Sequence, residues 1–519
     1  MTETGNPLAV PLGDVLAYHA AQGDGPALTH DGTTLSHSEL DRRANRRARM
    51  LAGLGVGQDD LVIMALPNDI EFFETSFALW KLGATPCPVS PKLARPEFEA
   101  IVETVDPRLV IGGEARVGDA PWLPAGSAPD PGLSDAAVEA GMPACWKALT
   151  SGGSTGRPKV ILTRLPGTTD PTRAGYALQR ACDTILNPGP LYHNAAFSSA
   201  HQCLFAGGHV VNMARFDAQQ SLELIERHRV DYVMMVPTMM SRIWHLPEEV
   251  RSAYDVSSLR TVVHLAAPCP SWLKERWIEW LGPDAIVEIY AGTEGVGATC
   301  ITGSEWLTHR GSVGRVVPGT GMRILDPDGK ECAPGEVGEI FFRPPAERLE
   351  SFGYIGASVK RIGDWFSLGD LGHIDADGYL YLTDRRTDMI VSGGVNIYPA
   401  EVENAISRHP DVRSCVVIGM PDEDLGNRVH AIVQLADGVR GRTDADALCA
   451  FLKSQLVRYK IPRTFEFVTG ELRDDAGKAR RSQLREARIT AGDHTAANQN
   501  HASGKIDGPE HAARAADQG

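Results

Sequence analysis

Two spacings of apolar residues divide the first part of the chain into alternating helices and strands. Apolar residues recur every three or four positions over residues 36–51, which predicts a helix. Ser36 and Glu39 stand at the start of this segment in the Ser-x-x-Glu pattern that caps a helix. The apolar run at residues 61–66 is typical of a buried parallel strand, and a second helix is expected from about residue 71 to 82. This alternation predicts doubly wound α/β sheets.

The same patterns continue toward the C-terminus and divide the chain into a large and a small domain. Short apolar segments that are typical of buried strands recur at residues 232–237, 259–265 and 286–291. A smaller β region, which includes residues 337–343, predicts a β-barrel-like subdomain. Beyond it, two strands and a helix at residues 445–456 indicate a compact α+β unit. We therefore expect an N-terminal domain over residues 1–386, a C-terminal domain over residues 387–490 and a disordered tail over residues 491–519.

Composition and charge exclude several classes of function. The chain of 519 residues has a formal net charge of -15, which disfavours non-specific binding to nucleic acid because phosphates need a basic face. Its nine cysteines are scattered without a Cys-x-x-Cys pair, as is typical of reduced thiols in a cytosolic protein. The N-terminus shows no signal peptide, and no apolar run reaches the roughly 20 residues that span a bilayer. We therefore expect a cytoplasmic protein with no nucleic-acid partner and no membrane span.

Residues 151–159 carry the most distinctive local chemistry. Glycines and hydroxyl side chains alternate there between two apolar, strand-like runs, and two cations end the segment. Glycine lets backbone N–H groups approach a ligand without a Cβ in the way, and successive N–H groups in such a turn form a concave anion site. Lys159 adds a positive charge. The segment therefore predicts a phosphate-binding loop between two strands, with a flexible surface loop as the alternative; the Gly-Lys-Ser/Thr of a Walker A loop does not follow.

This segment resembles the phosphate loop of the adenylate-forming enzymes, a superfamily that includes acyl-CoA synthetases, adenylation domains of peptide synthetases and luciferases. The usual pattern there is Thr-Ser-Gly-Ser/Thr-Thr-Gly-x-Pro-Lys, and here Ser151 replaces the threonine and Gly152 replaces the serine. Further segments over roughly residues 35–485 match the family in the same order. The resemblance implies that the phosphates of ATP contact Ser151, Gly152, Gly153, Ser154, Thr155, Gly156 and Lys159.

A predicted strand at residues 286–291 leads into a glycine turn that presents a hydroxyl and a carboxylate. A carboxylate beside a triphosphate requires a cation between them, and Mg²⁺ binds through one or two carboxylates plus phosphates. Glu294 is therefore the expected metal ligand, and a surface turn ending in Glu is the alternative. The family has Tyr-Gly-x-Thr-Glu here, so Ala291 departs from the pattern. The resemblance implies nucleotide-binding roles for Tyr290, Ala291 and Gly292 and catalytic roles for Thr293 and Glu294.

Three further residues are assigned to the nucleotide through the resemblance. Ala267 lies in a turn of small residues after a predicted strand, which leaves room for a ligand. Asp370 stands at a predicted strand end, where an acidic side chain can accept hydrogen bonds from both ribose hydroxyls. Arg385 matches an arginine that contacts the nucleotide, and its rigid, permanently charged fork suits this task. The hinge between the domains falls at Thr387, where the family usually has Asp or Lys.

The remaining candidates concern the acid, a catalytic lysine and CoA. His193 matches an aromatic gate of the family's acyl pocket, and a histidine that caps the start of a helix is the alternative. Lys478 resembles the mobile lysine that bridges the carboxylate and the α-phosphate; on sequence alone it is a basic residue on a solvated face. Gly393 and Gly394 resemble the loop along which the pantetheine arm of CoA runs. The C-terminal domain is therefore expected to be mobile.

The resemblance implies an AMP-forming ligase of the acyl-CoA synthetase type. Such an enzyme uses ATP and Mg²⁺ to convert a carboxylic acid into acyl-AMP with release of pyrophosphate, and then transfers the acyl group to CoA. The alternatives are nitrite as the activated acid, a carrier protein as the acceptor, and a catalytically silent nucleotide-binding homologue. The sequence does not identify the acid, and a homodimer is left open as the assembly.

Overall fold

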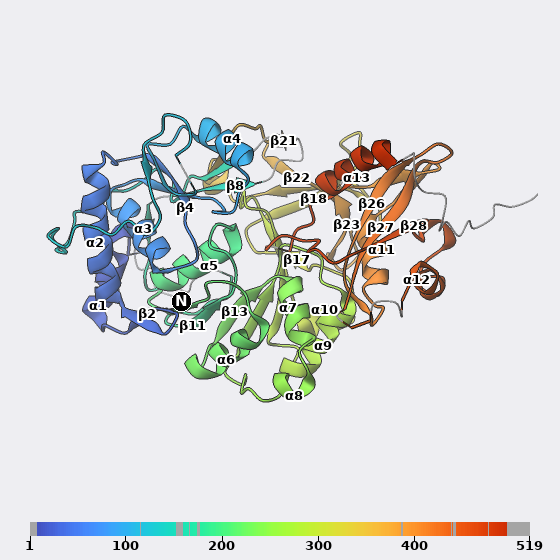
Figure 1. Ribbon diagram of the computed structural model, residues 1–519, viewed down its shortest axis with the longest axis horizontal. Coiled ribbons are helices and arrows are strands. Elements are labelled where there is room, and N and C mark those ends of the chain that lie inside the picture. The colour runs from blue at the N-terminus through green and yellow to red at the C-terminus, as the bar shows by residue number, and fades with distance from the viewer. Residues whose placement is uncertain are drawn as a thin grey trace, which may run out of the picture.

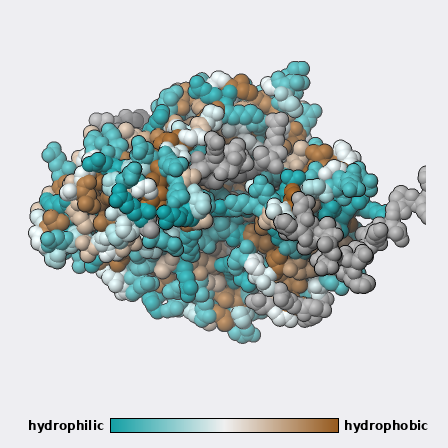
Figure 2. Space-filling model, turned by 45° about the horizontal axis from the view of Figure 1, so that its top comes forward, coloured by the Kyte–Doolittle hydropathy of each residue, from teal (hydrophilic) through white to brown (hydrophobic). Residues whose placement is uncertain are grey.

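The computed structural model describes residues 8–495, except residues 115, 152–158, 166, 174–176, 386–387, 437, 440–442 and 476. Figure 1 shows a large body that holds the N-terminal and central elements, and a smaller unit at the right that holds the C-terminal ones. The face in Figure 2 is mainly hydrophilic, with apolar atoms in small scattered groups. Within the described residues no helix is long and apolar enough to cross a membrane. The predicted tail lies outside them from residue 496 on.

A mostly parallel sheet forms the centre of the large body. In the described part of the chain its strand order is β17-β16-β15-β14-β13-β11-β12-β2-β3, with antiparallel pairing only at β3, β16 and β17. Its strands are β2 (Pro26–His30), β3 (Thr33–Ser36), β11 (Thr184–Asn187), β12 (His209–Asn212), β13 (Tyr232–Met235), β14 (Thr261–His264), β15 (Ile286–Ala291), β16 (Ala298–Thr302) and β17 (Arg315–Val316). The carboxyl ends of its parallel strands therefore meet at one edge.

Helices cover both faces of this sheet, so the predicted doubly wound arrangement is confirmed. One apolar core joins the sheet to α1 (Val15–Gln22), α2 (His37–Gly53), α3 (Ile70–Lys81) and α5 (Asn194–Phe205). A second core joins the opposite face to α6 (Ala218–His228), α7 (Pro237–Trp244), α9 (Ser271–Leu281) and α10 (Gly303–Thr308). The capping prediction for α2 is also confirmed, since Ser36 Oγ accepts from the N–H of Glu39 at 3.2 Å and the Glu39 carboxylate accepts from the N–H of Ser36.

A smaller parallel sheet lies beside the first one. Its order among the described residues is β5-β4-β6-β7, with β4 (Leu61–Ala65), β5 (Thr85–Pro88), β6 (Leu109–Gly112), β7 (Trp122–Leu123) and the connecting helix α4 (Arg95–Val105). The predicted strand at residues 61–66 is thus β4. Its buried residue Ile63 shares a core with Ala148 and Val160, which lie on the two strands that flank the glycine-rich segment. The two strands that flank the glycine-rich segment are therefore anchored on a parallel sheet.

In place of the β-barrel-like subdomain that the sequence predicts, the described residues form two separate antiparallel sheets. One has the order β20-β9-β8, with β8 (Lys147–Ser151), β9 (Lys159–Thr163) and β20 (Phe352–Ile355). The other joins β18 (Gly321–Leu325), β19 (Gly338–Arg343), β21 (Lys360–Ile362), β22 (Trp365–Ile374) and β23 (Leu380–Arg385). A short ladder of β1 (Val10–Pro11) with β10 (Thr168–Thr169) and the short helix α8 (Glu248–Arg251) complete the body. Residues 375–378 form the turn between β22 and β23.

The C-terminal unit is α+β, as predicted. It comprises the hairpin β24 (Ile390–Ser392) and β25 (Val395–Ile397), the sheet β26 (Val412–Asp422), β27 (Gly426–Leu435) and β28 (Thr464–Val468), and the helices α11 (Pro399–Ile406), α12 (Ala445–Leu452) and α13 (Arg481–Thr495). The predicted helix at residues 445–456 ends early, at Leu452. The amides of Ser454 and Gln455 bond to carbonyls three residues back instead of four, so the helix tightens and stops.

Candidate active site

The two strands predicted around the glycine-rich segment are present and pair antiparallel. Ser151 at the end of β8 lies opposite Lys159 at the start of β9. The predicted phosphate-binding residues Gly152, Gly153, Ser154, Thr155 and Gly156 lie outside the described residues, as does the side chain of Ser151. Lys159 is therefore the member of this set whose side chain can be placed.

Lys159 meets the predicted metal ligand and a tyrosine that the sequence reasoning missed. Its Nζ lies 3.3 Å from Oε1 of Glu294 and 3.4 Å from the hydroxyl of Tyr354, and 4.5 Å from the centre of the Tyr354 ring. The same hydroxyl donates to Oε1 of Glu294 over 2.5 Å. Burial, followed by the nearby Glu294 charge, raises the pKa of Tyr354 far above its ordinary range. The phenol therefore keeps its proton and remains a donor to the carboxylate.

Each member of this trio comes from a different part of the chain. Lys159 lies on β9, Glu294 in the turn after β15, and Tyr354 on β20, where it pairs with Ile161. The Glu294 side chain is 9% exposed and that of Lys159 is 27% exposed. The nearly buried carboxylate of Glu294, beside Lys159 on β9, offers hard oxygen atoms as metal ligands. This donor chemistry fits Mg²⁺.

Gly292 lies in close contact with neighbouring side chains in the turn that carries Glu294. A Cβ there would lie 2.5 Å from Cδ1 of Leu368 and 2.8 Å from Oε2 of Glu294. Gly292 therefore lets β22, which carries Leu368, pack directly on the turn. Thr293 is partly exposed in this turn, immediately before Glu294.

Two predicted nucleotide residues touch each other across the same junction. The hydroxyl of Tyr290, on β15, donates to Oδ2 of Asp370, on β22, over 2.6 Å. The sequence predicts Asp370 at a strand end, and this prediction is wrong. Asp370 lies within the ten-residue strand β22. Two glycines close to Asp370, Gly369 and Gly372, suggest a break in the strand. In the structure β22 continues through both, with a positive φ of 84° at Gly369 and a shift in the pairing register at Gly372. Asp370 pairs in register with Arg385, whose side chain lies outside the described residues.

The remaining predicted nucleotide residues lie near the carboxyl edge of the central sheet. Ala291 ends β15, and Ala267 follows β14 in a turn where Ala266 adopts a positive φ of 72°. β14 and β15 are parallel neighbours, so their ends are adjacent. Ala267 is partly exposed and its small side chain leaves space beside this edge.

His193 occupies the N-cap position of α5, but its side chain makes no capping hydrogen bond. The alternative of a histidine at the start of a helix is therefore correct in position, but the side chain does not cap the helix. Burial lowers the pKa of His193 to about 4, so the ring is neutral at pH 7. The charges of Asp474 and Lys478 also act on this ring, which places the C-terminal lysine segment beside the start of α5.

The lysine segment forms a tight turn that rests on the central sheet. The N–H of Lys478 donates to Oδ1 of Asp474 at 2.9 Å, and the N–H of Gly477 donates to the Asp474 carbonyl at 2.8 Å. A Cβ on Gly477 would lie 3.3 Å from Oγ1 of Thr238 and 3.4 Å from Cβ of Val236. Both residues follow β13, so the turn is seated at the carboxyl edge of the sheet.

Gly393 and Gly394 lie elsewhere, at the exposed tip of the β24–β25 hairpin. Their φ angles are +55° and +78°, the conformation that a two-residue hairpin turn requires and that glycine adopts without strain. The structure therefore brings Lys478 to the sheet edge and keeps this predicted CoA segment in solvent. The predicted hinge residue Thr387 lies outside the described residues.

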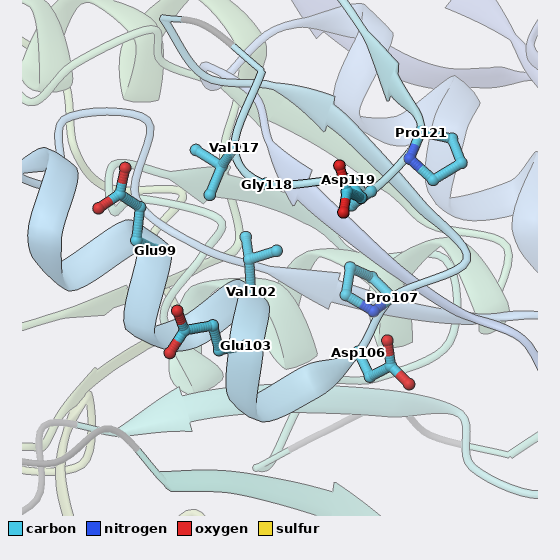
Figure 3. A pocket seen from close by; sticks show the side chains of 10 residues that line it. Glu99, Val102, Glu103, Asp106, Pro107, Val117, Gly118, Asp119 and Pro121 are labelled. Atoms are coloured by element: carbon cyan, nitrogen blue, oxygen red, sulfur yellow. The ribbon is translucent and has the colours of Figure 1, made fainter.

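A separate pocket lies along α4 (Figure 3). Its lining combines apolar residues with four carboxylates, which are Glu99, Glu103, Asp106 and Asp119. It contains none of the predicted site residues, and its acidic lining is unsuited to an anionic nucleotide.

Two family models match the chain. The model of the AMP-binding enzyme matches residues 17–347, and that of the AMP-binding enzyme C-terminal domain matches residues 401–478. The first match alone covers more than half of the chain. The two matches correspond to the large body and to the C-terminal unit.

Individual relatives extend over nearly the whole chain. A feruloyl-CoA synthase of Amycolatopsis sp is 34% identical over 472 residues, which cover 88% of this chain and 95% of that protein. The long-chain-fatty-acid–CoA ligase FadD13 of Mycobacterium tuberculosis is 31% identical over 475 residues, with 87% and 93% covered.

A solved structure shares the fold. The o-succinylbenzoate CoA synthetase of Bacillus subtilis, in complex with its acyl-adenylate intermediate, is 26% identical with a TM-score of 0.76, covering 92% of this chain and 98% of that one. The same synthetase, solved with ATP and a magnesium ion, gives 25% identity and a TM-score of 0.75, covering 92% of this chain and 100% of that one.

Proposed function

The chain belongs to the AMP-binding enzyme family, and on this premise we propose that it is an AMP-forming acid–CoA ligase. It activates a carboxylic acid with ATP as acyl-AMP, releases pyrophosphate and transfers the acyl group to the thiol of CoA. The observation that carries the proposal is the meeting of Lys159, Glu294 and Tyr354 beside the phosphate-loop strands. Relatives that are CoA ligases over nearly their full length support the same activity.

We assign the phosphates of ATP to the glycine-rich segment at residues 151–159. Its backbone N–H groups and Lys159 would offset the charge of the departing pyrophosphate. Glu294, with Thr293 beside it, would hold Mg²⁺, which neutralises phosphate charge when it is bound. Tyr354 would keep the Glu294 carboxylate oriented through its hydrogen bond.

The nucleoside is assigned to the carboxyl edge of the central sheet. Asp370 would accept hydrogen bonds from the ribose hydroxyls. The hydroxyl of Tyr290, 2.6 Å from Oδ2 of Asp370, would hold the carboxylate in place. Arg385, opposite Asp370 in register, would contact the nucleotide through its charged fork. The backbone around Ala267, Ala291 and Gly292 would line the base.

The proposed chemistry has two steps. In the first, an oxygen of the acid's carboxylate attacks the α-phosphorus of ATP, and pyrophosphate leaves with the bonding electron pair. Lys478 would offset the repulsion between these two anions. In the second, the CoA sulfur attacks the acyl carbon, AMP leaves, and the thiol proton passes to solvent or base. His193, which is neutral at pH 7, would border the acid without adding a charge to it.

We place the boundary between the adenylation domain and the mobile C-terminal domain at residues 386–387, which lie outside the described residues. The structure has Lys478 at the sheet edge and Gly393–Gly394 exposed to solvent. This arrangement suits the first step, which would use the lysine and not the glycine hairpin. The second step would require the C-terminal domain to rotate, withdraw the lysine and present the Gly393–Gly394 hairpin to CoA.

The test is pyrophosphate release with ATP and Mg²⁺ on a panel of acids: ferulate, a long-chain fatty acid, 2-succinylbenzoate, and nitrite with an aryl amine. We expect at least one carboxylic acid to give acyl-AMP and, with CoA, a thioester. Lys478→Ala should largely abolish adenylate formation and leave ATP binding intact. Absence of any adenylate from the panel would refute the proposed function. Turnover with nitrite but with none of the carboxylic acids would instead favour nitrite as the activated substrate.

The acceptor is tested in the same assay. A related fatty acid–[acyl-carrier-protein] ligase of Streptomyces coeruleorubidus is 29% identical over 521 residues, so a carrier protein is the second candidate acceptor. A thioester formed with a carrier protein but not with free CoA would favour it. A homodimer is a separate expectation, which sedimentation of the purified chain would test.

A further inference from the structure

One tyrosine joins the turn that carries Lys478 to the acid side of the proposed site. The hydroxyl of Tyr192 donates a hydrogen bond to Oδ2 of Asp475 over 3.2 Å. Tyr192 directly precedes His193, and the centres of their rings lie 4.5 Å apart. Burial raises the pKa of Tyr192 to about 12, so the hydroxyl remains a donor at neutral pH. A side-chain hydrogen bond therefore links the start of α5 to the C-terminal unit.

The position of Asp475 sets the position of Lys478 because their turn is internally bonded. The N–H of Asp474 donates to the carbonyl of Lys478 at 2.9 Å, and the N–H of Gly477 donates back to Asp474 at 2.8 Å. The Asp474 carboxylate also accepts from the N–H of Lys478. A displacement of Asp475 therefore moves Lys478 with it.

The other polar contacts across this junction have a different character. Arg242 pairs with Glu471 at 2.7 Å and Arg480 pairs with Glu97 at 3.4 Å. These pairs join long, exposed side chains, which contribute little and adapt easily. Lys92 lies 3.9 Å from Asp475 with 82% of its side chain exposed. The acceptor Asp475 is itself 58% exposed, so the Tyr192 contact differs in its donor alone, which is a half-buried, stiff side chain next to the acid gate.

We propose that Tyr192 is a positioning residue for adenylation, which acts through Asp475 to hold the Lys478 turn against the acid side of the site. This inference rests on the proposed function, in which Lys478 serves the first step only. Transfer of the acyl group to CoA does not use Lys478, so Tyr192 acts on one half-reaction and not on the other. An acid that packs against His193 also steadies the adjacent Tyr192, which links acid binding to docking of the turn.

The test compares full-length wild type with Tyr192→Phe, which removes the hydroxyl and keeps the ring. The probe is whichever of ferulate, a long-chain fatty acid or 2-succinylbenzoate gives the fastest pyrophosphate release. Single-turnover adenylate formation should slow about tenfold, the low end of the effect of losing a hydrogen bond to a charged group, because Asp475 is 58% exposed. The KM for the acid should change less than about twofold, because the ring that borders the pocket is retained. Conversion of synthetic acyl-AMP and CoA into acyl-CoA should keep its wild-type rate.

Four matched variants separate positioning from a general loss of docking. Asp475→Asn keeps an oxygen acceptor and should be faster in adenylation than Asp475→Ala. The double variant Tyr192→Phe/Asp475→Ala should be no slower than Asp475→Ala, because the two residues act through one contact. Glu471→Gln weakens the pair with Arg242 and should leave both half-reactions at their wild-type rates. Unfolding midpoints equal to that of the wild type exclude a folding defect.

Several results would overturn the inference. These are an equal slowing of both half-reactions in Tyr192→Phe, no slowing of either, or fully additive effects in the double variant. If the wild type and Tyr192→Phe form adenylate at the same rate, this inference is overturned and the proposed function stands. A wild type that forms no adenylate from any acid overturns the proposed function and this inference with it.

Discussion

Replacing Lys147 by methionine should stabilise the protein. Lys147 lies on β8 and is 4% exposed. Its ammonium lies 2.5 Å from Oδ1 of Asn194 and 2.5 Å from Oγ of Ser198, and 4.3 Å from the centre of the Trp146 ring. Burial alone lowers its pKa, with no opposite charge acting on it among the described residues. A buried charge that has only neutral partners destabilises the folded state.

The magnitude follows from the pKa. Burial lowers the pKa of Lys147 from 10.5 to about 7. At roughly 1.4 kcal/mol per unit, the buried ammonium destabilises the folded state by about 5 kcal/mol below pH 7. Methionine removes this penalty together with two hydrogen bonds of about 1 kcal/mol each. Since Ser198 still donates to Asn194 at 3.1 Å, these two groups keep each other as partners, and the net gain is about 2–3 kcal/mol.

The pH dependence gives this prediction its sign. Between about pH 7 and pH 10.5 the unfolded chain holds a proton on Lys147 that the folded protein has released. The wild type therefore gains stability as the pH rises through this window. The advantage of Lys147→Met is full below pH 7, disappears near pH 9, where the remaining burial penalty equals about 2 kcal/mol of lost hydrogen bonds, and reverses at higher pH.

The assay is urea unfolding, followed by tryptophan fluorescence, at pH 6, 7.5 and 9. Lys330→Met is the matched control, because Lys330 is exposed in the turn after β18, and its difference from the wild type should be small at every pH. A Lys147→Met variant that is less stable than the wild type at pH 6 would refute the reasoning. So would a gap that stays constant from pH 6 to pH 9.

Three further substitutions test the trio and its turn. Glu294→Gln keeps the shape but loses the charge that would hold Mg²⁺, so adenylate formation should fall about a hundredfold while calorimetric ATP binding persists; an unchanged rate would contradict the metal role. Tyr354→Phe should raise the Mg²⁺ concentration for half-maximal rate about tenfold, because it frees the Glu294 carboxylate; a magnesium titration checks this. Gly292→Ala should lower the urea midpoint by the equivalent of about 1–3 kcal/mol, since its Cβ would overlap Leu368, and an unchanged midpoint would contradict the packing.

Local patterns were sufficient for the elements and for part of the site. The Ser36–Glu39 cap, the two strands around residues 151–159 and the strand that delivers Tyr290 are all readable because their signals lie within a few residues. Tyr354 carried no such signal. Its role depends on β20 pairing with β9, a contact between segments far apart in the chain, and nothing in the short strand Phe352–Ile355 marks its tyrosine as special.

Glycines misled the sequence reasoning about Asp370. Gly369 and Gly372 flank it closely and suggest a strand end, but β22 passes through both. The adjacent acidic residues Asp474 and Asp475 carried no local signal of a role in the site. Their contacts with Lys478 and Tyr192 depend on how the C-terminal unit rests on the large body, which no local pattern encodes.

The pairing of Lys159 with Glu294 has a consequence for how the proposed site admits its ligands. Without ligands, each of these charges compensates the other at 3.3 Å, so neither is left isolated in a site where Glu294 is 9% exposed. In the proposed complex, phosphate takes over as the partner of Lys159 and Mg²⁺ as the partner of Glu294. Because an opposite charge faces each residue before and after binding, the site avoids the cost of an unpaired buried charge. Tyr354 can donate a hydrogen bond to Glu294 both before and after binding. β20, which carries Tyr354, therefore belongs to the proposed site as much as the glycine-rich segment at residues 151–159 does.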